Sequence, residues 1–179
     1  MGSLSVYCAD NEEELRVFYN KTKNDIFKSV LKYEAEFDKN NCVIIQEKMK
    51  GSEYGLDIIN NLEGDFVNTI VKQKIAMRAG ETDCAKVVEN DTLYNIGKTI
   101  SGQLKHIANL DVDVFFNGTD AYVLEMNARF GGGYPFSHLA GVDLPKAIVA
   151  WLSKEQPDKE ILKATSGVIG YKDLSMVKG

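Results

Sequence analysis

The chain has 179 residues, of which 44% are hydrophobic and 26% are charged. This composition is typical of a globular domain and excludes fibrous, collagen-like and wholly disordered proteins. No apolar run approaches the roughly 20 residues that span a bilayer, and the N-terminus has neither the charged start nor the apolar stretch of a signal peptide. The net charge of -5 disfavours a nucleic-acid binder, which needs a broad basic surface, but allows a small anionic ligand.

The cysteines and histidines argue against several kinds of site. Cys8, Cys42 and Cys84 are far apart and odd in number, which disfavours both a disulfide framework and a structural zinc site. Three reduced thiols are typical of a cytoplasmic protein. His106 and His138 are the only histidines, and no Ser-His-Asp arrangement stands out.

The first half of the chain alternates helical and strand patterns. Asp10 and Glu13 resemble a capping box, which predicts a helix that begins near Asn11. The predicted elements, in order, are a strand at 4–8, helices at 11–19 and 25–37, a buried strand at 42–47, and strands at 53–60 and 66–76.

The second half contains the clearest motifs. A polar, irregular segment at 78–83 precedes a short strand at 86–89. Asp91 is expected to cap a helix whose apolar stripe is Leu93, Ile96, Ile100, Leu104 and Ile107. The later elements are a hairpin of strands at 112–116 and 121–126, a loop at 128–133, a helix at 144–152 and a strand at 168–171. The fold class is therefore α+β with a mainly antiparallel sheet.

Polar residues gather on the predicted hairpin. Because side chains alternate along a strand, Glu125 and Asn127 should share one face with Val123, while Leu124 and Met126 point into apolar surroundings. Asp113 lies on the partner strand, and oxygen donors of this kind bind hard cations such as Mg²⁺. Arg129 can reach the same ligand, which suits a substrate that carries phosphate. The alternative is that these side chains form only the solvated face of an edge strand.

The spacing Asp113-x(11)-Glu125-x-Asn127-x-Arg129 resembles the ATP-grasp superfamily, especially the branch of the carbamoyl phosphate synthase large subunit and biotin carboxylase. The resemblance implies that Asp113, Glu125 and Asn127 bind the Mg²⁺ or Mn²⁺ ions on ATP. Arg129 would contact the reacting phosphate or acyl phosphate. Relatives commonly carry Glu or Gln at the first position, so Asp113 is one methylene shorter than usual.

Residues 44–54 are similar to the hinge strand of the same family. This similarity implies that Glu47, Lys48 and Met49 meet the adenine and that Glu53 faces the ribose. From the residues alone, an exposed strand end is the simpler interpretation of this segment.

The segment from Lys72 to Gly80 resembles the basic strand and loop beside the triphosphate in ATP-grasp proteins. Lys72 and Lys74 would therefore bind phosphate, and Arg78 would act in catalysis. Two lysines by themselves usually mean a solvated surface.

The resemblance extends from about Cys42 to Leu152, so the chain is incomplete relative to a full ATP-grasp protein. It implies a remnant of the first lobe at 1–40 and the second lobe at 41–179. The expected function is an ATP- and Mg-dependent carboxylate ligase, which joins a small carboxylate to an amine through an acyl phosphate. The chain would be part of a longer enzyme, weakly active or inactive without the missing N-terminal domain of that protein, and its assembly could include a homodimer. The alternative is a non-catalytic ATP-binding or regulatory module.

Overall fold

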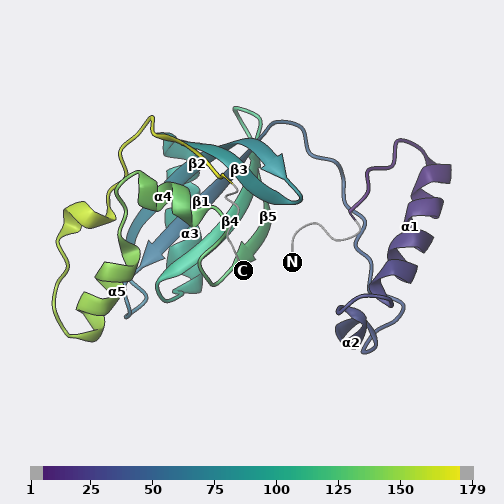
Figure 1. The fold of residues 1–179 in the computed structure, drawn as a ribbon, viewed down its shortest axis with the longest axis horizontal. Coiled ribbons are helices and arrows are strands. Elements are labelled where there is room, and N and C mark those ends of the chain that lie inside the picture. The colour runs from purple at the N-terminus through teal and green to yellow at the C-terminus, as the bar shows by residue number, and fades with distance from the viewer. Residues whose placement is uncertain (1–5, 174–179) are drawn as a thin grey trace, which may run out of the picture. The chain divides into compact units, whose positions relative to one another are not determined.

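A computed structural model describes residues 6–173 of the chain (Figure 1). The chain divides into two compact units, Met1–Met49 and Lys50–Gly179. This division falls later than the boundary between residues 40 and 41 that the sequence predicts, and the assignment of the two parts to ATP-grasp lobes stays a prediction. Among the described residues, no helix is long and apolar enough to cross a membrane.

The smaller unit is built on α1 (Glu12–Ile26). The predicted capping box exists one residue later than expected, because the Asn11 side chain accepts a hydrogen bond from the Glu14 backbone N–H at 2.9 Å. The Glu14 carboxylate in turn accepts from the Asp10 backbone N–H, also at 2.9 Å. These bonds fix the start of the helix, which then runs to Ile26, well past the predicted end at Tyr19.

Two predictions for this unit are wrong. The helix expected at 25–37 is broken after Ile26, where the Ser29 hydroxyl donates to the Ile26 carbonyl, and only the short α2 (Lys32–Ala35) follows. The buried strand expected at 42–47 is an exposed, irregular segment, because residues 6–49 contain no strand with which it could pair. The strand expected at 4–8 lies partly outside the described residues, and residues 6–8 are not in a strand.

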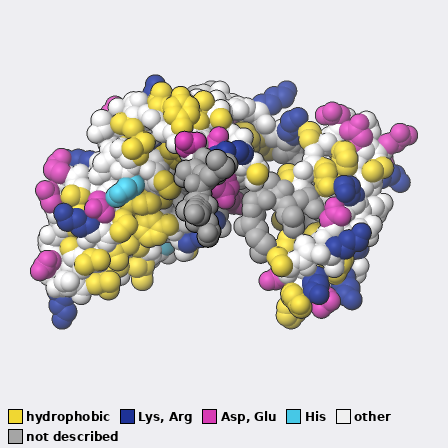
Figure 2. All heavy atoms as spheres, in the orientation of Figure 1, with side chains coloured by type: hydrophobic (Ala, Val, Ile, Leu, Met, Phe, Trp, Pro, Cys, Tyr) yellow, Lys and Arg dark blue, Asp and Glu magenta, His cyan; other side chains and the backbone are white. Residues whose placement is uncertain are grey.

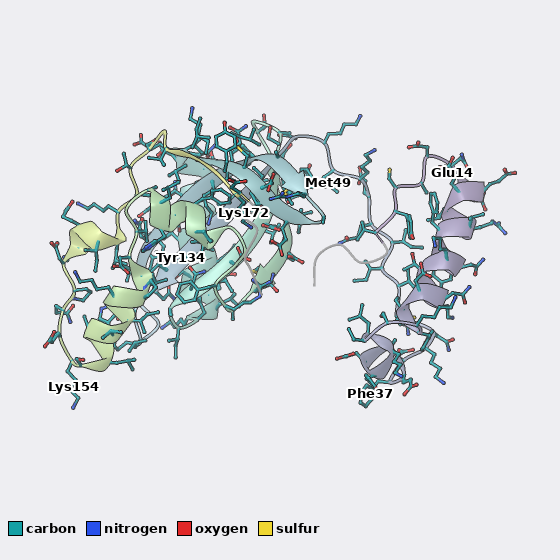
Figure 3. All side chains as sticks on the ribbon, in the orientation of Figure 1. Glu14, Phe37, Met49, Tyr134, Lys154 and Lys172 are labelled. Carbon is teal, nitrogen blue, oxygen red and sulfur yellow. The ribbon has the colours of Figure 1, made fainter. Side chains whose placement is uncertain are left out.

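Apolar side chains in this unit remain largely exposed. Phe37, which is labelled in Figure 3, is 92% exposed, and only Ile26 and Ala35 are buried among residues 6–49. The three thiols of the chain, at Cys8, Cys42 and Cys84, are free, as the sequence predicts.

The larger unit is a six-stranded sheet in which every neighbouring pair is antiparallel. This confirms the predicted fold class. The strand order is β5-β4-β1-β2-β3-β6. The strands are β1 (Ser52–Asn60), β2 (Phe66–Arg78), β3 (Glu81–Val87), β4 (Asn109–Phe116), β5 (Ala121–Asn127) and β6 (Ile169–Tyr171).

One face of the sheet packs against α3 (Asp91–Leu104). Leu56, Ile58, Val112 and Val114 are completely buried there with Leu93 of the helix. Strand alternation therefore directs the intervening residues of β1 and β4 to the opposite face.

The opposite face is covered at one end by α4 (Tyr134–Leu139) and α5 (Leu144–Leu152), with the 3₁₀ turn Lys159–Leu162 beside them (Figure 1). Tyr134 joins the two helices, because its hydroxyl donates to the Val142 carbonyl at 3.1 Å and accepts from the Leu144 N–H at 2.9 Å (Figure 3). Burial raises the pKa of Tyr134 to about 12, so the phenol remains a hydrogen-bond donor at neutral pH.

Two details of the strands differ from the prediction. The segment 78–83 is a tight hairpin end rather than an irregular loop, since Ala79 and Gly80 both have positive φ and connect β2 to β3. A bulge at Leu124 separates the pair Val114–Val123 from the pair Asp113–Glu125. Val123 therefore pairs with a core residue instead of sharing the face of Glu125.

Several apolar side chains of the larger unit are exposed. Leu124 and Met126 are 37% and 49% exposed, so the expectation that they point into apolar surroundings is wrong. Figure 2 shows a second group over α4 and α5, where Leu139, Val149 and Leu152 are more than half exposed.

Two glycines of α3 predict opposite effects of the same substitution. A Cβ at Gly97 would lie 2.3 Å from Thr69 Oγ1, whereas a Cβ at Gly102 would meet nothing within 4 Å. Gly97→Ala should lower the free energy of unfolding by about 1–3 kcal/mol through overpacking. Gly102→Ala should raise it by up to about 1 kcal/mol through helix propensity. Urea unfolding of the two variants measures both, and equal effects would contradict the packing of α3 on β2.

Candidate nucleotide and metal site

Two rows of polar residues cross the sheet on the face that α4 and α5 cover only in part. The first row runs from Lys72 through Gly55 and Asp113 to Glu125. The second row places Asp57, Asp111 and Asn127 side by side on β1, β4 and β5. Because directly paired residues point to the same face, the register brings together side chains that lie up to 70 positions apart in the sequence.

Lys74 joins two carboxylates at the open end of this face. Its ammonium nitrogen lies 2.6 Å from Glu53 Oε1 and 2.8 Å from Asp113 Oδ1. The lysine side chain is only 8% exposed, while those of Glu53 and Asp113 are 26% and 23% exposed. Burial lowers the pKa of Lys74, but the hydrogen bonds and charges of Asp113 and Glu53 outweigh burial and raise it overall. Lys74 is therefore charged at neutral pH.

Beneath this group lies a buried ion pair between Lys72 and Asp57. Their side chains are 2% and 0% exposed. Asp57 also accepts a hydrogen bond from the Ser137 hydroxyl of α4 at 2.5 Å and a longer one, 3.4 Å, from the Asn109 amide. The same amide donates to the Arg129 carbonyl at 3.2 Å. Asp57 thus connects β1 to β2, to α4 and to the turn that follows β5.

Arg129 lies over the second polar row. Its guanidinium donates to Asp111 Oδ2 at 3.3 Å and to the Phe130 carbonyl at 3.1 Å, and its side chain is 55% exposed. Burial, followed by the nearby charge of Asp57, raises the pKa of Asp111 to about 6. Gly131 packs directly on this carboxyl, because a Cβ there would lie about 2 Å from the Asp111 oxygens. Only glycine allows the turn to approach Asp111 this closely.

The atoms that could bind a metal ion at this face are all oxygen atoms. Glu125 is exposed, and its carboxylate accepts a hydrogen bond from the Asn127 amide at 3.2 Å. Asp113 lies directly opposite Glu125 on the neighbouring strand. This donor set fits Mg²⁺ or Mn²⁺ rather than a thiolate- or imidazole-bound metal. Across residues 6–173, no three His, Cys, Asp or Glu side chains are already grouped as metal ligands.

Other residues predicted to form the site lie elsewhere. Arg78 is at the β2–β3 turn, where its guanidinium pairs with Asp83. Glu47, Lys48 and Met49 belong to the smaller unit, and their role beside the adenine stays a prediction.

The sequence analysis missed three residues of this face, Asp57, Asn109 and Ser137. A signal for Asp57 was present, since the alternation that puts Leu56 and Ile58 in the core directs Asp57 to the same side as Glu53. Nothing in the sequence pointed to Ser137, because its partner is 80 residues away and α4 is too short to give a periodic pattern.

Comparison with known families settles the relationship of the chain. Residues 39–173 match the family described as "ATP-grasp in the biosynthetic pathway with Ter operon". The chain belongs to this ATP-grasp family. The predicted resemblance to the ATP-grasp superfamily is thereby confirmed. A comparison with curated protein sequences finds no match.

Solved structures share the fold of this ATP-grasp chain at low sequence identity. Biotin carboxylase from Campylobacter jejuni, described as a β-γ-ATP complex, has a TM-score of 0.71 and 15% identity, and the match covers 94% of this chain and 39% of that one. The biotin carboxylase domain of Hydrogenobacter thermophilus 2-oxoglutarate carboxylase has a TM-score of 0.70 and 14% identity, covering 94% and 38%. L-amino acid ligase from Bacillus licheniformis has a TM-score of 0.61 and 15% identity, covering 96% and 44%. The chain therefore spans less than half of each of these proteins.

The ion pair beneath the site should dominate the stability of the larger unit. Asp57→Asn leaves the Lys72 ammonium buried without a counter-ion, which should lower the free energy of unfolding by about 3–5 kcal/mol. A double variant, Asp57→Asn with Lys72→Met, should recover part of that loss because it removes the unpaired charge. Urea unfolding measures both.

An exposed pair on the same unit provides the control. Lys163 and Glu160 are 63% and 70% exposed, so Glu160→Gln should change the free energy of unfolding by less than about 1 kcal/mol. Lys72→Met alone completes the cycle for the buried pair. If the Asp57→Asn, Lys72→Met double variant loses as much stability as the two single variants together, Asp57 and Lys72 are not energetically coupled.

Proposed function

We propose that this chain supplies the nucleotide- and metal-binding part of an ATP- and Mg-dependent carboxylate ligase that works through an acyl phosphate. The observation that carries the proposal is the group of Lys74, Asp113 and Glu125, in which Lys74 pairs with Asp113 and Asp113 lies opposite Glu125, with Asn127 and Arg129 beside it. Acids that can hold a cation, flanked by two cationic side chains, match the charge pattern of a metal–polyphosphate complex.

Each side chain has a distinct part in this proposal. Asp113, Glu125 and Asn127 would hold Mg²⁺, which neutralises charge on the transferring phosphoryl group when it is bound. Lys74 and Arg129 would contact phosphate oxygens, since both cations lie at the edge of the acidic group. Arg129 would also stabilise charge on an acyl phosphate.

Of the remaining predicted residues, some would contact the nucleotide and one would support the structure of the site. Glu47, Lys48 and Met49 would meet the adenine, with Glu53 toward the ribose, and Arg78 would approach the phosphates from the β2–β3 turn. We assign Lys72 to support rather than to phosphate contact, because its ammonium is buried against Asp57.

The family and its structural neighbours support a proposal for the substrate class. Two neighbouring structures are described as complexes, one with β-γ-ATP and the other with MgADP and bicarbonate, and a third neighbour is an L-amino acid ligase. We infer a small carboxylate and an amine as substrates, with no nucleic acid or membrane surface involved. The rest of a longer protein would close the site, and a homodimer is a further arrangement to test, since one neighbour is described as a dimer.

Nucleotide binding should depend on a divalent cation. Calorimetric titration of the 179-residue chain with ATP should give at least about tenfold tighter binding with Mg²⁺ than with EDTA, since the acids repel uncomplexed triphosphate. Glu125→Gln should remove most of that advantage, while apo stability changes by less than about 0.5 kcal/mol because Glu125 is exposed.

Glu155→Gln is the matched control, because Glu155 is an exposed acid outside the site. This variant should leave the affinity for ATP unchanged, both with Mg²⁺ and with EDTA. Equal affinity for ATP with and without Mg²⁺ would contradict the metal site, and a large loss of apo stability in Glu125→Gln would show that Glu125 is structural.

The alternative function, a non-catalytic ATP-binding module, is separated from a ligase by turnover. Because a nucleotide held on one open face remains exposed to water, we expect the isolated chain to release little phosphate from ATP. Joining it to the remainder of a longer ligase should give phosphate release that depends on a carboxylate. Mg·ATP binding without turnover in any such assembly would favour the module.

A further inference from the structure

Lys74 already pairs with one of the carboxylates assigned to the metal. Its ammonium lies 2.8 Å from Asp113 Oδ1, and the same group lies 2.6 Å from Glu53 Oε1. Asp113 is thus already paired with a cation, although it is the carboxylate that faces Glu125 across the hairpin.

The surroundings keep Lys74 in this position. Its side chain is only 8% exposed, and its stem passes close to Gly55 of β1, which has no side chain. A Cβ at Gly55 would lie 3.7 Å from Lys74 Cε and 3.9 Å from Asp113 Oδ1, so the lysine lies along the groove that the missing side chain leaves. The ammonium therefore cannot move into bulk water without giving up both carboxylates and its packing.

A free divalent cation is disfavoured by this arrangement. To bind Asp113 Oδ1, the ion must displace the ammonium and then remain close to it, because Glu53 still holds Lys74. Two cations that share one partly buried acidic group repel each other strongly.

A metal–nucleotide complex can bind without this repulsion, because it brings its own partners for the Lys74 ammonium. Its phosphate oxygens are acceptors for the ammonium that leaves Asp113, so the lysine exchanges one charge-assisted hydrogen bond for another. The metal takes the carboxylate that the lysine releases, and no buried cation is left without a partner.

We propose that Lys74 is a resident counter-cation that keeps free divalent cations off Asp113 and allows the metal to bind only together with a polyphosphate. This proposal rests on the proposed function, because it uses the same acidic site. It gives Lys74 a role in the order of ligand binding in addition to phosphate contact.

The test uses Mn²⁺ alone, whose free aquo form is counted by its electron paramagnetic resonance signal. The wild-type chain should bind Mn²⁺ weakly. Lys74→Met, and Lys74→Gln if the first variant folds poorly, should tighten Mn²⁺ binding by about tenfold or more, because both acids lose their counter-ion. Lys74→Arg keeps the charge and should remain as weak as the wild type.

Two further variants locate the effect. Lys98→Met removes an equal charge from an exposed position on α3, so it should not tighten Mn²⁺ binding. Adding Glu125→Gln to Lys74→Met should abolish the gain. Titration with Mg·ATP should show the opposite change, which is a loss of affinity in Lys74→Met. General destabilisation of the chain cannot weaken Mg·ATP binding and tighten Mn²⁺ binding at the same time.

The outcomes separate this inference from the proposed function. If wild type and Lys74→Met bind Mn²⁺ equally, or neither binds it, Lys74 does not exclude free metal and the inference is wrong. In either case, Mg·ATP binding that is lost in Glu125→Gln would leave the proposed function standing. If no form binds Mg·ATP, the proposed function fails as well.

Discussion

The polar face of the sheet depends on one buried interaction, the ion pair between Asp57 and Lys72. A carboxylate and an ammonium removed from water are tolerated only when each has partners, so the chain supplies Asp57 with the Ser137 hydroxyl and the Asn109 amide as well. These partners come from the neighbouring strand β4 and from the helix α4. The pair therefore fixes α4 and the turn at Arg129 against the sheet.

The same face has two different environments along its length. Toward α4 and α5, the residues that share it are apolar, and Ile59 and Ile70 are buried among the helices. Toward the start of β1, Glu53 and Lys74 take their place and are partly open to solvent. Asp57 lies at the junction, where the apolar side chains end and the charged ones begin. The metal and phosphate site proposed at this junction would have packed side chains on one side and water on the other.

The two units differ in how firmly local sequence determines their structure. In residues 50–173, strands and helices pack on the two faces of one sheet, so the patterns of β1 and α5 correspond closely to the observed elements. Along α3, Leu93, Ile96 and Ile100 of the predicted stripe pack on the sheet, whereas Leu104 and Ile107 are exposed. In residues 6–49, the apolar pattern at Val30, Tyr33 and Phe37 has no core within its own unit, and all three remain exposed. Helical spacing without a packing partner was therefore a poor guide to the helix.

The sequence by itself determined the fold class, the hairpin of β4 and β5, and the group of Asp113, Glu125, Asn127 and Arg129. These features depend on short-range alternation and on a spacing of residues within one hairpin, both of which are legible along the chain. Only the tertiary structure decided how the charges pair. Whether Lys72 faces Asp57 or a ligand, and whether Lys74 holds Asp113, depends on the register of strands whose order in the sheet differs from their order in the sequence. The bulge at Leu124 is also a feature of strand pairing. One extra residue in a strand changes which side chains share a face, and it is recognised only when β5 is paired with β4.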